Sequence, residues 1–172
     1  MDSIDRVMHS FSVHEYKRNQ PIVRQGEIWP EFMVIESGLI RMHFLRQDGR
    51  EFNKNFFTEK QLLCPLTPAM WSAPSLFGIT AIESTSMWSC SIDVFIDQLS
   101  GMEWSAIQRE LLSRLLDGKL QREHDLLALN AGQRYEKFCC SQPALADRVP
   151  LLHLATYLGM TDVTLSRLRS KA

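Results

Sequence analysis

The sequence predicts an α+β fold, with an N-terminal double-stranded β-helix (jelly roll), a long helix and an all-α helix-turn-helix unit, in that order. Three patterns predict it. Short apolar runs separated by turn residues occupy residues 15–98, which is typical of a jelly roll or a β-sandwich. Residues 104–129 have helical periodicity, and residues 148–171 have the pattern of two helices joined by a glycine turn.

Composition and charge limit the classes of protein that fit. With 172 residues and 45% hydrophobic content, the chain has room for one medium domain and a smaller one. Its net charge of −1 excludes a chain that is basic throughout. From Asn130 onward, however, six Lys or Arg face three Asp or Glu, a net charge of +3 that leaves −4 for the preceding residues. This asymmetry predicts a basic tail domain on an acidic body, although a solvated helical surface has the same signature.

The first hundred residues contain short elements. Residues 2–14 have apolar side chains at helical spacing and are predicted to form a short amphipathic helix. Asp48 and Gly49 lie between two apolar runs and predict a hairpin with a type I′ turn, in which both central residues need positive φ. Residues 78–92 are predicted to form one long strand or two shorter ones, and residues 93–99 a short helix.

The long helix has two apolar rows. One row is expected to cover the jelly roll of its own chain; it consists of Trp104, Ile107, Leu111 and Leu115. The second row, Leu112, Leu116 and Leu120, needs another surface, and the same helix of a second subunit would supply it in an isologous dimer. The alternative is that both rows pack within one subunit, because globular helices often have wide apolar stripes.

A domain boundary is expected at Leu129-Asn130. Asn130 and Gln133 have the spacing of a capping box that starts a new helix, and Pro143 breaks or kinks that helix. The predicted domains are therefore residues 1–103 for the jelly roll, 104–129 for the dimerisation helix and 130–172 for the helix-turn-helix domain.

The last segment gives the most specific pattern. Pro150 can open a helix, Gly159 can end it in a left-handed conformation, and Thr161 can cap the next helix through its hydroxyl. The predicted inward side chains are Leu151, Leu152, Leu154, Ala155 and Leu158 on the first helix, and Val163, Leu165 and Leu168 on the second. An ordinary helical hairpin is the alternative, since it can place a small residue and a glycine at the same offsets.

These segments, in this order, resemble the Crp/Fnr family of cyclic-AMP-receptor-like transcription regulators. The resemblance rests on residues 23–27, 33–38, 47–51 and 154–161, followed by 164–167. It implies a cyclic-nucleotide-binding-domain-like sensor roll, a homodimer formed through the long helix, and two recognition helices that enter successive major grooves of an inverted-repeat DNA site. It also implies contact with RNA polymerase.

The resemblance assigns roles on the second helix of the motif. Thr161 would be the N-cap, and Thr164 would approach phosphate. Arg167 is the strongest candidate for specificity, because a guanidinium can donate two hydrogen bonds to guanine. The residues facing base edges would be Asp162, Val163, Ser166 and Arg167. Arg169 and Lys171 would contact the DNA backbone, or be solvent-exposed charges.

Three departures limit what the resemblance implies. Leu76-Phe77-Gly78 stands where cyclic-AMP-binding members have an Arg-Ser pair, and residues 58–61 are a weak substitute for their Gly-Glu turn. A buried cyclic phosphate would therefore lack a charge partner, so we expect no tight cyclic-AMP binding, no cofactor, and leave the ligand-binding residues unassigned. Asp162 and Val163 replace an Arg and a Glu, so the DNA consensus cannot be transferred. The chain ends at Ala172, so we expect no β-hairpin wing and weaker, less salt-dependent DNA binding.

Other classes find little support. The five histidines (His9, His14, His43, His124 and His153) show no metal-ligand spacing, and no Ser/His/Asp arrangement is visible, so neither an enzyme nor a metal site is expected. The four cysteines (Cys64, Cys90, Cys139 and Cys140) lack a C-x-x-C pair and are expected to be buried, reduced thiols. No signal peptide or membrane span is apparent, which predicts a cytoplasmic protein with no membrane partner. The alternative function is a ligand-binding or protein-interaction module without DNA-binding activity.

Overall fold

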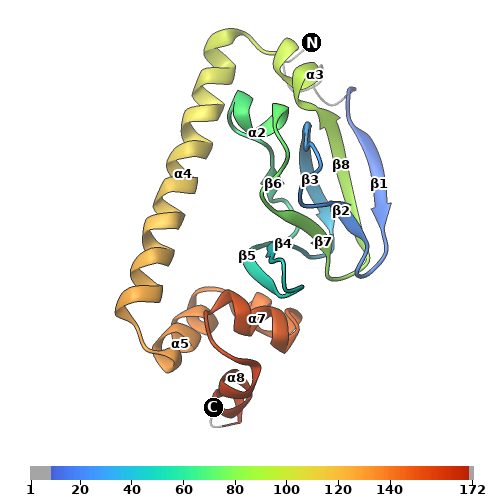
Figure 1. Ribbon diagram of the computed structural model, residues 1–172. Helices are drawn as coiled ribbons and strands as arrows, with labels where there is room; N and C mark the ends of the chain where they lie inside the picture. The colour runs from blue at the N-terminus through green and yellow to red at the C-terminus, as the bar shows by residue number, and fades with distance from the viewer. Residues whose placement is uncertain (1–8, 171–172) are drawn as a thin grey trace.

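A computed structural model describes residues 9–170 as a β-roll, a long helix along one side of it, and a group of short helices at its end (Figure 1). The strands are β1 (Ser12–Tyr16), β2 (Pro21–Val23), β3 (Glu31–Ser37), β4 (Ile40–Leu45), β5 (Glu51–Phe57), β6 (Leu62–Leu63), β7 (Gly78–Ala81) and β8 (Thr85–Ser91). The helices are α2 (Pro68–Ser72), α3 (Ile92–Asp97), α4 (Gly101–Ala128), α5 (Ala131–Ser141), α6 (Pro143–Arg148), α7 (Leu151–Tyr157) and α8 (Asp162–Arg169).

The roll consists of two four-stranded antiparallel sheets, with strand orders β1-β8-β3-β6 and β2-β7-β4-β5. In the first, Val34 of β3 pairs with Trp88 of β8, and in the second Met42 of β4 pairs with Ile79 of β7. Alternate side chains of both sheets pack into one apolar core, which includes Met33, Ile35, Ile40, Met42, Ile79 and Met87. The predicted jelly roll is confirmed.

The hairpin at Asp48 and Gly49 is confirmed, but its predicted turn type is wrong. Of these two residues only Gly49 has positive φ, at 79°. The connection is longer than two residues: the Arg46 N–H donates to the Arg50 carbonyl over 2.9 Å, and the Gly49 N–H donates to the Arg46 carbonyl over 3.0 Å. In a loop of this length, one left-handed glycine after an ordinary turn is enough to reverse the chain.

One prediction for the roll is wrong, at residues 12–14, and one that allowed two alternatives is decided, at residues 78–92. Residues 12–14, predicted as the end of an amphipathic helix, lie in β1, because pairing with β8 overrides local helical periodicity. Residues 2–8 of that predicted helix lie outside the described residues. Residues 78–92 form two strands, β7 and β8, with a turn between them.

α4 starts at Gly101, three residues before the predicted start at Trp104. Ser100 and Glu103 form a capping box there: the Ser100 hydroxyl accepts from the Glu103 N–H, and the Glu103 carboxylate accepts from the Ser100 N–H. The second predicted capping box, at Asn130 and Gln133, is confirmed at the start of α5.

The two apolar rows of α4 have different surroundings. Trp104, Leu111 and Leu115 pack against an apolar cluster that includes Phe32 of β3 and Phe95 of α3. The second row is not covered by the described part of the chain: Leu112, Leu116 and Leu120 are 37%, 57% and 56% exposed. The alternative in which one subunit buries both rows is therefore wrong.

The cysteines differ in burial. Cys64 and Cys90 are buried, and burial raises the pKa of the Cys64 thiol to about 12. Cys139 is half-buried and Cys140 is exposed, so the expectation that all four are buried is wrong. Cys140 is exposed because only one side of α5 faces the core, through Phe138.

Among the helices of residues 9–170, none is both long and apolar enough to cross a membrane.

Candidate nucleic-acid interface

α7 and α8 form a helix-turn-helix. Gly159 follows α7 with φ of 66°, a left-handed conformation that glycine adopts at little cost. The turn also lies close to the end of α4, since a Cβ on Gly159 would come within 2.9 Å of Leu126 Cδ2. Thr161 caps α8 as predicted: its hydroxyl accepts from the Thr164 N–H over 3.2 Å.

Leu154, Ala155 and Leu165 have no exposed surface and hold the two helices together. Two predicted inward side chains are exposed instead, Leu152 at 59% and Val163 at 55%. Leu152 lies two residues before Leu154, and Val163 two residues before Leu165, so each is about 200° around its helix from that fully buried side chain.

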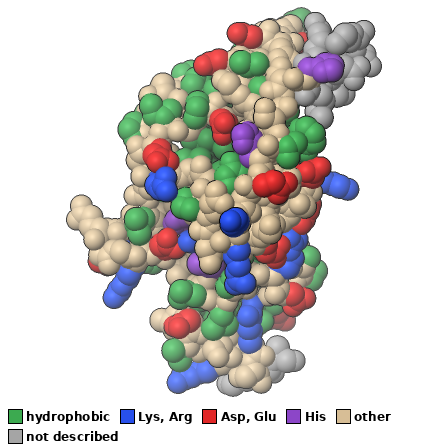
Figure 2. Space-filling model, turned by 90° about the vertical axis from the view of Figure 1, so that its right-hand side faces the viewer, with side chains coloured by type: hydrophobic (Ala, Val, Ile, Leu, Met, Phe, Trp, Pro, Cys, Tyr) green, Lys and Arg blue, Asp and Glu red, His purple; other side chains and the backbone are tan. Residues whose placement is uncertain are grey.

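The residues predicted to face base edges lie on the outward face of α8. Asp162, Val163, Ser166 and Arg167 are exposed. The Asp162 carboxylate accepts from the Val163 N–H over 2.9 Å, at the helix N-terminus, where a negative charge is favourable. In the view of Figure 2, several Lys and Arg side chains lie in the lower part, where Figure 1 places α7 and α8.

The other predicted contact residues are held differently. Thr164 is half-buried, and its hydroxyl bonds to that of Thr161 over 2.8 Å. The Arg169 guanidinium donates to the Ala146 carbonyl over 2.8 Å, which directs it back into its own domain. Lys171 lies outside the described residues. Neither Arg169 nor Thr164 is thus as accessible as Arg167.

Arg134 of α5 fixes the turn of the motif, a role that no sequence pattern predicted. Its guanidinium donates to the carbonyls of Leu158 over 2.7 Å, Gly159 over 3.3 Å and Leu129 over 2.6 Å. These carbonyls lie at the ends of α7 and α4, where helices leave backbone acceptors unpaired. One side chain therefore joins the end of the long helix to the helix-turn-helix.

Arg148, at the end of α6, joins the helical domain, which consists of α5 to α8, to the roll. It donates to Glu83 over 2.7 and 3.1 Å and to Glu59 over 2.8 and 2.9 Å. These hydrogen bonds lower the pKa of Glu59 to about 2. Glu59 also accepts from the Gly38 N–H over 3.0 Å. The segment 58–61, considered above as a substitute for a ligand-binding turn, therefore supplies a docking contact.

A second polar contact lies between the β4–β5 hairpin and α7. Asn53, only 2% exposed, donates to the Thr156 hydroxyl over 2.8 Å and to the His153 carbonyl over 3.1 Å. On the same hairpin, Glu51 pairs with Arg41 over 2.6 Å. Burial, followed by the positive charge of Arg41, lowers the pKa of His153 to about 4. The neutral ring fits, since Nδ1 faces the Asn53 amide over 3.4 Å.

The segment aligned with the Arg-Ser pair of cyclic-AMP binders contains an aromatic contact. The Phe77 ring packs edge-on against Trp29 with centroids 5.8 Å apart, and the ammonium of Lys54 lies 5.1 Å from its centroid. Leu76 is 77% exposed. The expectation of weak cyclic-AMP binding stays a prediction, as does that of a missing wing.

Comparison with solved structures identifies the fold. FixK2 from Bradyrhizobium japonicum matches with a TM-score of 0.81 and 19% identity, over 94% of this chain and 83% of the other. The c-di-GMP responsive global regulator CLP from Xanthomonas campestris matches with a TM-score of 0.76 and 16% identity, over 98% and 89%. A protein from Eubacterium rectale, described as a transcriptional regulator of the crp/fnr family, matches with a TM-score of 0.76 and 13% identity, over 98% and 81%.

No protein-family model matches the sequence, and no curated protein matches it. The chain thus has the fold of Crp/Fnr regulators at a sequence identity below 20% to these three structures.

Proposed function

We propose that the protein is a homodimeric, DNA-binding transcription regulator, with a β-roll sensor that does not bind cyclic AMP tightly. The observation that carries the proposal is the outward face of α8, on a helix-turn-helix fixed by Gly159, Thr161 and Arg134. The fold supports it, because it is shared with a protein described as a global regulator and with one described as a transcriptional regulator. Such a protein would act in the cytoplasm, on DNA and in contact with RNA polymerase.

The dimer would form through α4. Leu112, Leu116 and Leu120 recur every four residues on the side of the helix that its own roll leaves uncovered. In an isologous pair the same row of each subunit meets the other, which buries both. Two copies of α8 would then lie about 34 Å apart and read an inverted repeat.

Arg167 would read a base. It is exposed in the second turn of α8, and a guanidinium that donates to guanine O6 and N7 discriminates against a wrong base by about 1 to 3 kcal/mol. Ser166 and Val163 would flank it, while Arg169 would serve mainly to hold the domain together.

A selection of genomic DNA fragments with the purified protein tests the function. The wild type should enrich an inverted repeat, and Arg167→Ala should lose preference at one position of each half-site. Arg18→Ala is the matched control, since Arg18 is exposed in the turn after β1 and should leave the selection unchanged.

A lack of enrichment even at low salt would refute DNA reading and favour the interaction module, for which the exposed Asp162-Val163 pair would offer an acidic and an apolar contact. For the sensor, isothermal titration should detect no micromolar binding of cyclic AMP; such binding would overturn this part of the proposal.

A further inference from the structure

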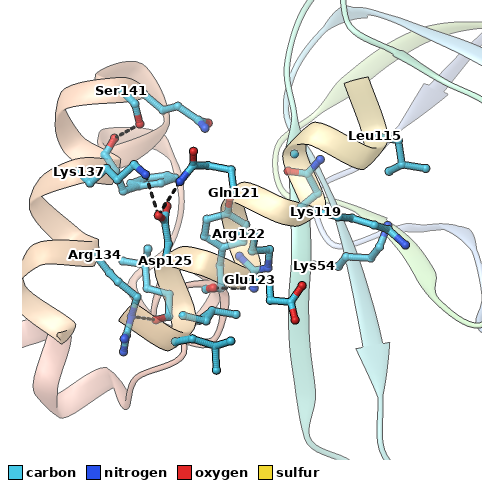
Figure 3. Close-up of a pocket in the computed structure, with 18 of the residues that line it drawn as sticks. Lys54, Leu115, Lys119, Gln121, Arg122, Glu123, Asp125, Arg134, Lys137 and Ser141 are labelled. Atoms are coloured by element: carbon cyan, nitrogen blue, oxygen red, sulfur yellow. Dashed lines mark hydrogen bonds and ion pairs between the residues drawn. The ribbon is translucent and has the colours of Figure 1, made fainter. Parts of the chain in front are cut away.

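A cleft of about 760 Å³ lies where the roll, the long helix and the helical domain meet. Its walls come from β5, from the second half of α4, and from α5 and α7 (Figure 3). This volume lies within the range of about 300–1,000 Å³ that small-molecule sites occupy. A bound ligand would contact the roll, through β5, and the helical domain, through α5 and α7, at the same time.

The lining is strongly basic. Two carboxylates, Glu123 and Asp125, face six cations in the cleft: Lys54, Arg114, Lys119, Arg122, Arg134 and Lys137. Asp125 is already neutralised, because Lys137 lies 2.7 Å from its carboxylate. Arg114 likewise pairs with Glu110, over 2.7 Å. One carboxylate, Glu123, then remains in the lining beside four cations: Lys54, Lys119, Arg122 and Arg134.

Two of these guanidiniums are bound to uncharged groups. Arg122 donates to the Tyr157 carbonyl over 2.8 Å and stacks on the Tyr157 ring at 4.2 Å. Among residues 9–170, Arg134 donates its hydrogen bonds to three carbonyls. Their positions are therefore fixed while their charges stay uncompensated. Fixed guanidiniums are suited to phosphate, since they bind it without first losing conformational freedom.

Lys54 is the least expected member of the group. It projects from β5 beside Lys119, as Figure 3 shows, and its ammonium contacts the Met42 sulfur over 3.4 Å. No Asp or Glu within residues 9–170 forms an ion pair with Lys54 or Lys119. Burial, followed by the charges of Lys119 and Arg122, lowers the pKa of Lys54. Its contacts within residues 9–170, the Met42 sulfur and the Phe77 ring, are uncharged, so a bound anion would supply the counter-charge that this partly buried ammonium lacks.

We propose that this cleft binds a small molecule with a diphosphate group, whose oxygens would contact Lys54, Lys119 and Arg122. The diphosphate could belong to a nucleotide or be inorganic pyrophosphate. Because Arg122 also donates to the Tyr157 carbonyl of α7, a ligand held between β5 and α4 would act, through Arg122, as an effector that biases the position of the helix-turn-helix. This regulatory role rests on the proposed function; the binding itself does not.

The test is isothermal titration of the full chain at about 50 mM salt with ADP, pyrophosphate and adenosine. ADP should bind and adenosine should not; pyrophosphate binding as tightly as ADP would indicate that the diphosphate alone is recognised, and weaker binding that the nucleoside contributes. The double variant Lys54→Met/Lys119→Met should weaken binding at least tenfold. Lys17→Met, an exposed lysine in the turn after β1, is the matched control and should bind like the wild type.

Folding is checked in the same samples. Lys54→Met removes a partly buried charge but also its contact with the Phe77 ring, so its melting temperature should stay within about 4 °C of that of the wild type. Absence of binding by both ADP and pyrophosphate at millimolar concentration would refute the site, as would equal affinity in the double variant. The DNA selection, repeated with and without ADP, separates the two proposals. ADP binding without DNA enrichment refutes the DNA-binding function and the effector role that rests on it, but not the binding site. ADP binding without any change in enrichment refutes only the effector role.

Discussion

Replacement of Arg148 by Met tests whether the ion pairs to the roll hold the helical domain in place. The side chains of Arg148, Glu59 and Glu83 are 29%, 37% and 35% exposed, so solvent weakens their attraction. A buried hydrogen bond to a charged group contributes about 1.5–3 kcal/mol, and an exposed ion pair about 0–1 kcal/mol. Two pairs of intermediate exposure should together contribute about 2 kcal/mol. Met keeps the apolar part of the Arg148 side chain, so the substitution removes the charge and its hydrogen bonds but little packing.

For a chain of this size, about 1 kcal/mol shifts the melting temperature by roughly 2–4 °C. Arg148→Met should therefore lower it by about 4–8 °C at pH 7 in differential scanning calorimetry. The difference should depend on pH. The pKa of Glu59 is lowered from 4.5 to about 2 in the folded chain, so its contribution is present above pH 4.5 and is lost as the pH falls through about 2. The difference in melting temperature between Arg148→Met and the wild type should therefore become smaller as the pH falls from 4.5 to about 2.

Arg24→Met is the matched control. Arg24 pairs with Glu27 over 3.5 Å, but their side chains are 69% and 51% exposed, so this pair should contribute at most about 0.5 kcal/mol. If the two variants melted at the same temperature, the ion pairs of Arg148 would not stabilise the docked domain and the reasoning would be refuted.

Three further variants test other contacts. Leu165→Ala should cost about 2–5 kcal/mol in urea unfolding, because Leu165 is fully buried between α7 and α8; a loss below 1 kcal/mol would contradict its anchoring role. Leu116→Glu should give a monomer in sedimentation experiments at micromolar concentration where the wild type is a dimer, and a dimeric variant would exclude this row as the interface. The lowered pKa of His153 keeps it neutral, so stability present above pH 6.5 should be lost between about pH 6.5 and 4. His153→Gln should melt with a weaker pH dependence over that window, and an unchanged slope would show that His153 is not responsible.

Local patterns predicted most elements of the fold. Asn130 with Gln133, and Gly159 with Thr161, mark helix ends because each satisfies backbone groups of its immediate neighbours. The start of α4 was predicted three residues too late, although the sequence contains the Ser-x-x-Glu signal of a capping box at Ser100.

Contacts between distant residues had no such signal. Arg148 reaches Glu59 and Glu83 across 89 and 65 residues, and Arg134 reaches Gly159 across 25. A charged residue in a helix has many sequence-distant candidates for a partner, and only the fold selects among them. For the same reason the basic cleft was not predicted: Lys54 and Lys119 belong to different elements, and neither is part of a charge run.

The composition of the contact between roll and helical domain bears on how a ligand could control it. The roll contributes three buried apolar residues, Leu39, Phe56 and Ile82, and the rest of the contact includes the ion pairs of Arg148 and the hydrogen bonds of Asn53. Interfaces with a small apolar component permit relative domain motion more readily than large apolar ones. A ligand shifts such an equilibrium only by its difference in affinity between the two states. To offset about 2 kcal/mol from Arg148, that difference must be roughly 30-fold, since 1.4 kcal/mol corresponds to a factor of ten. A diphosphate bridging β5 and α4 could reach this value through two or three charge-assisted hydrogen bonds, provided that the second state separates Lys54 from Arg122.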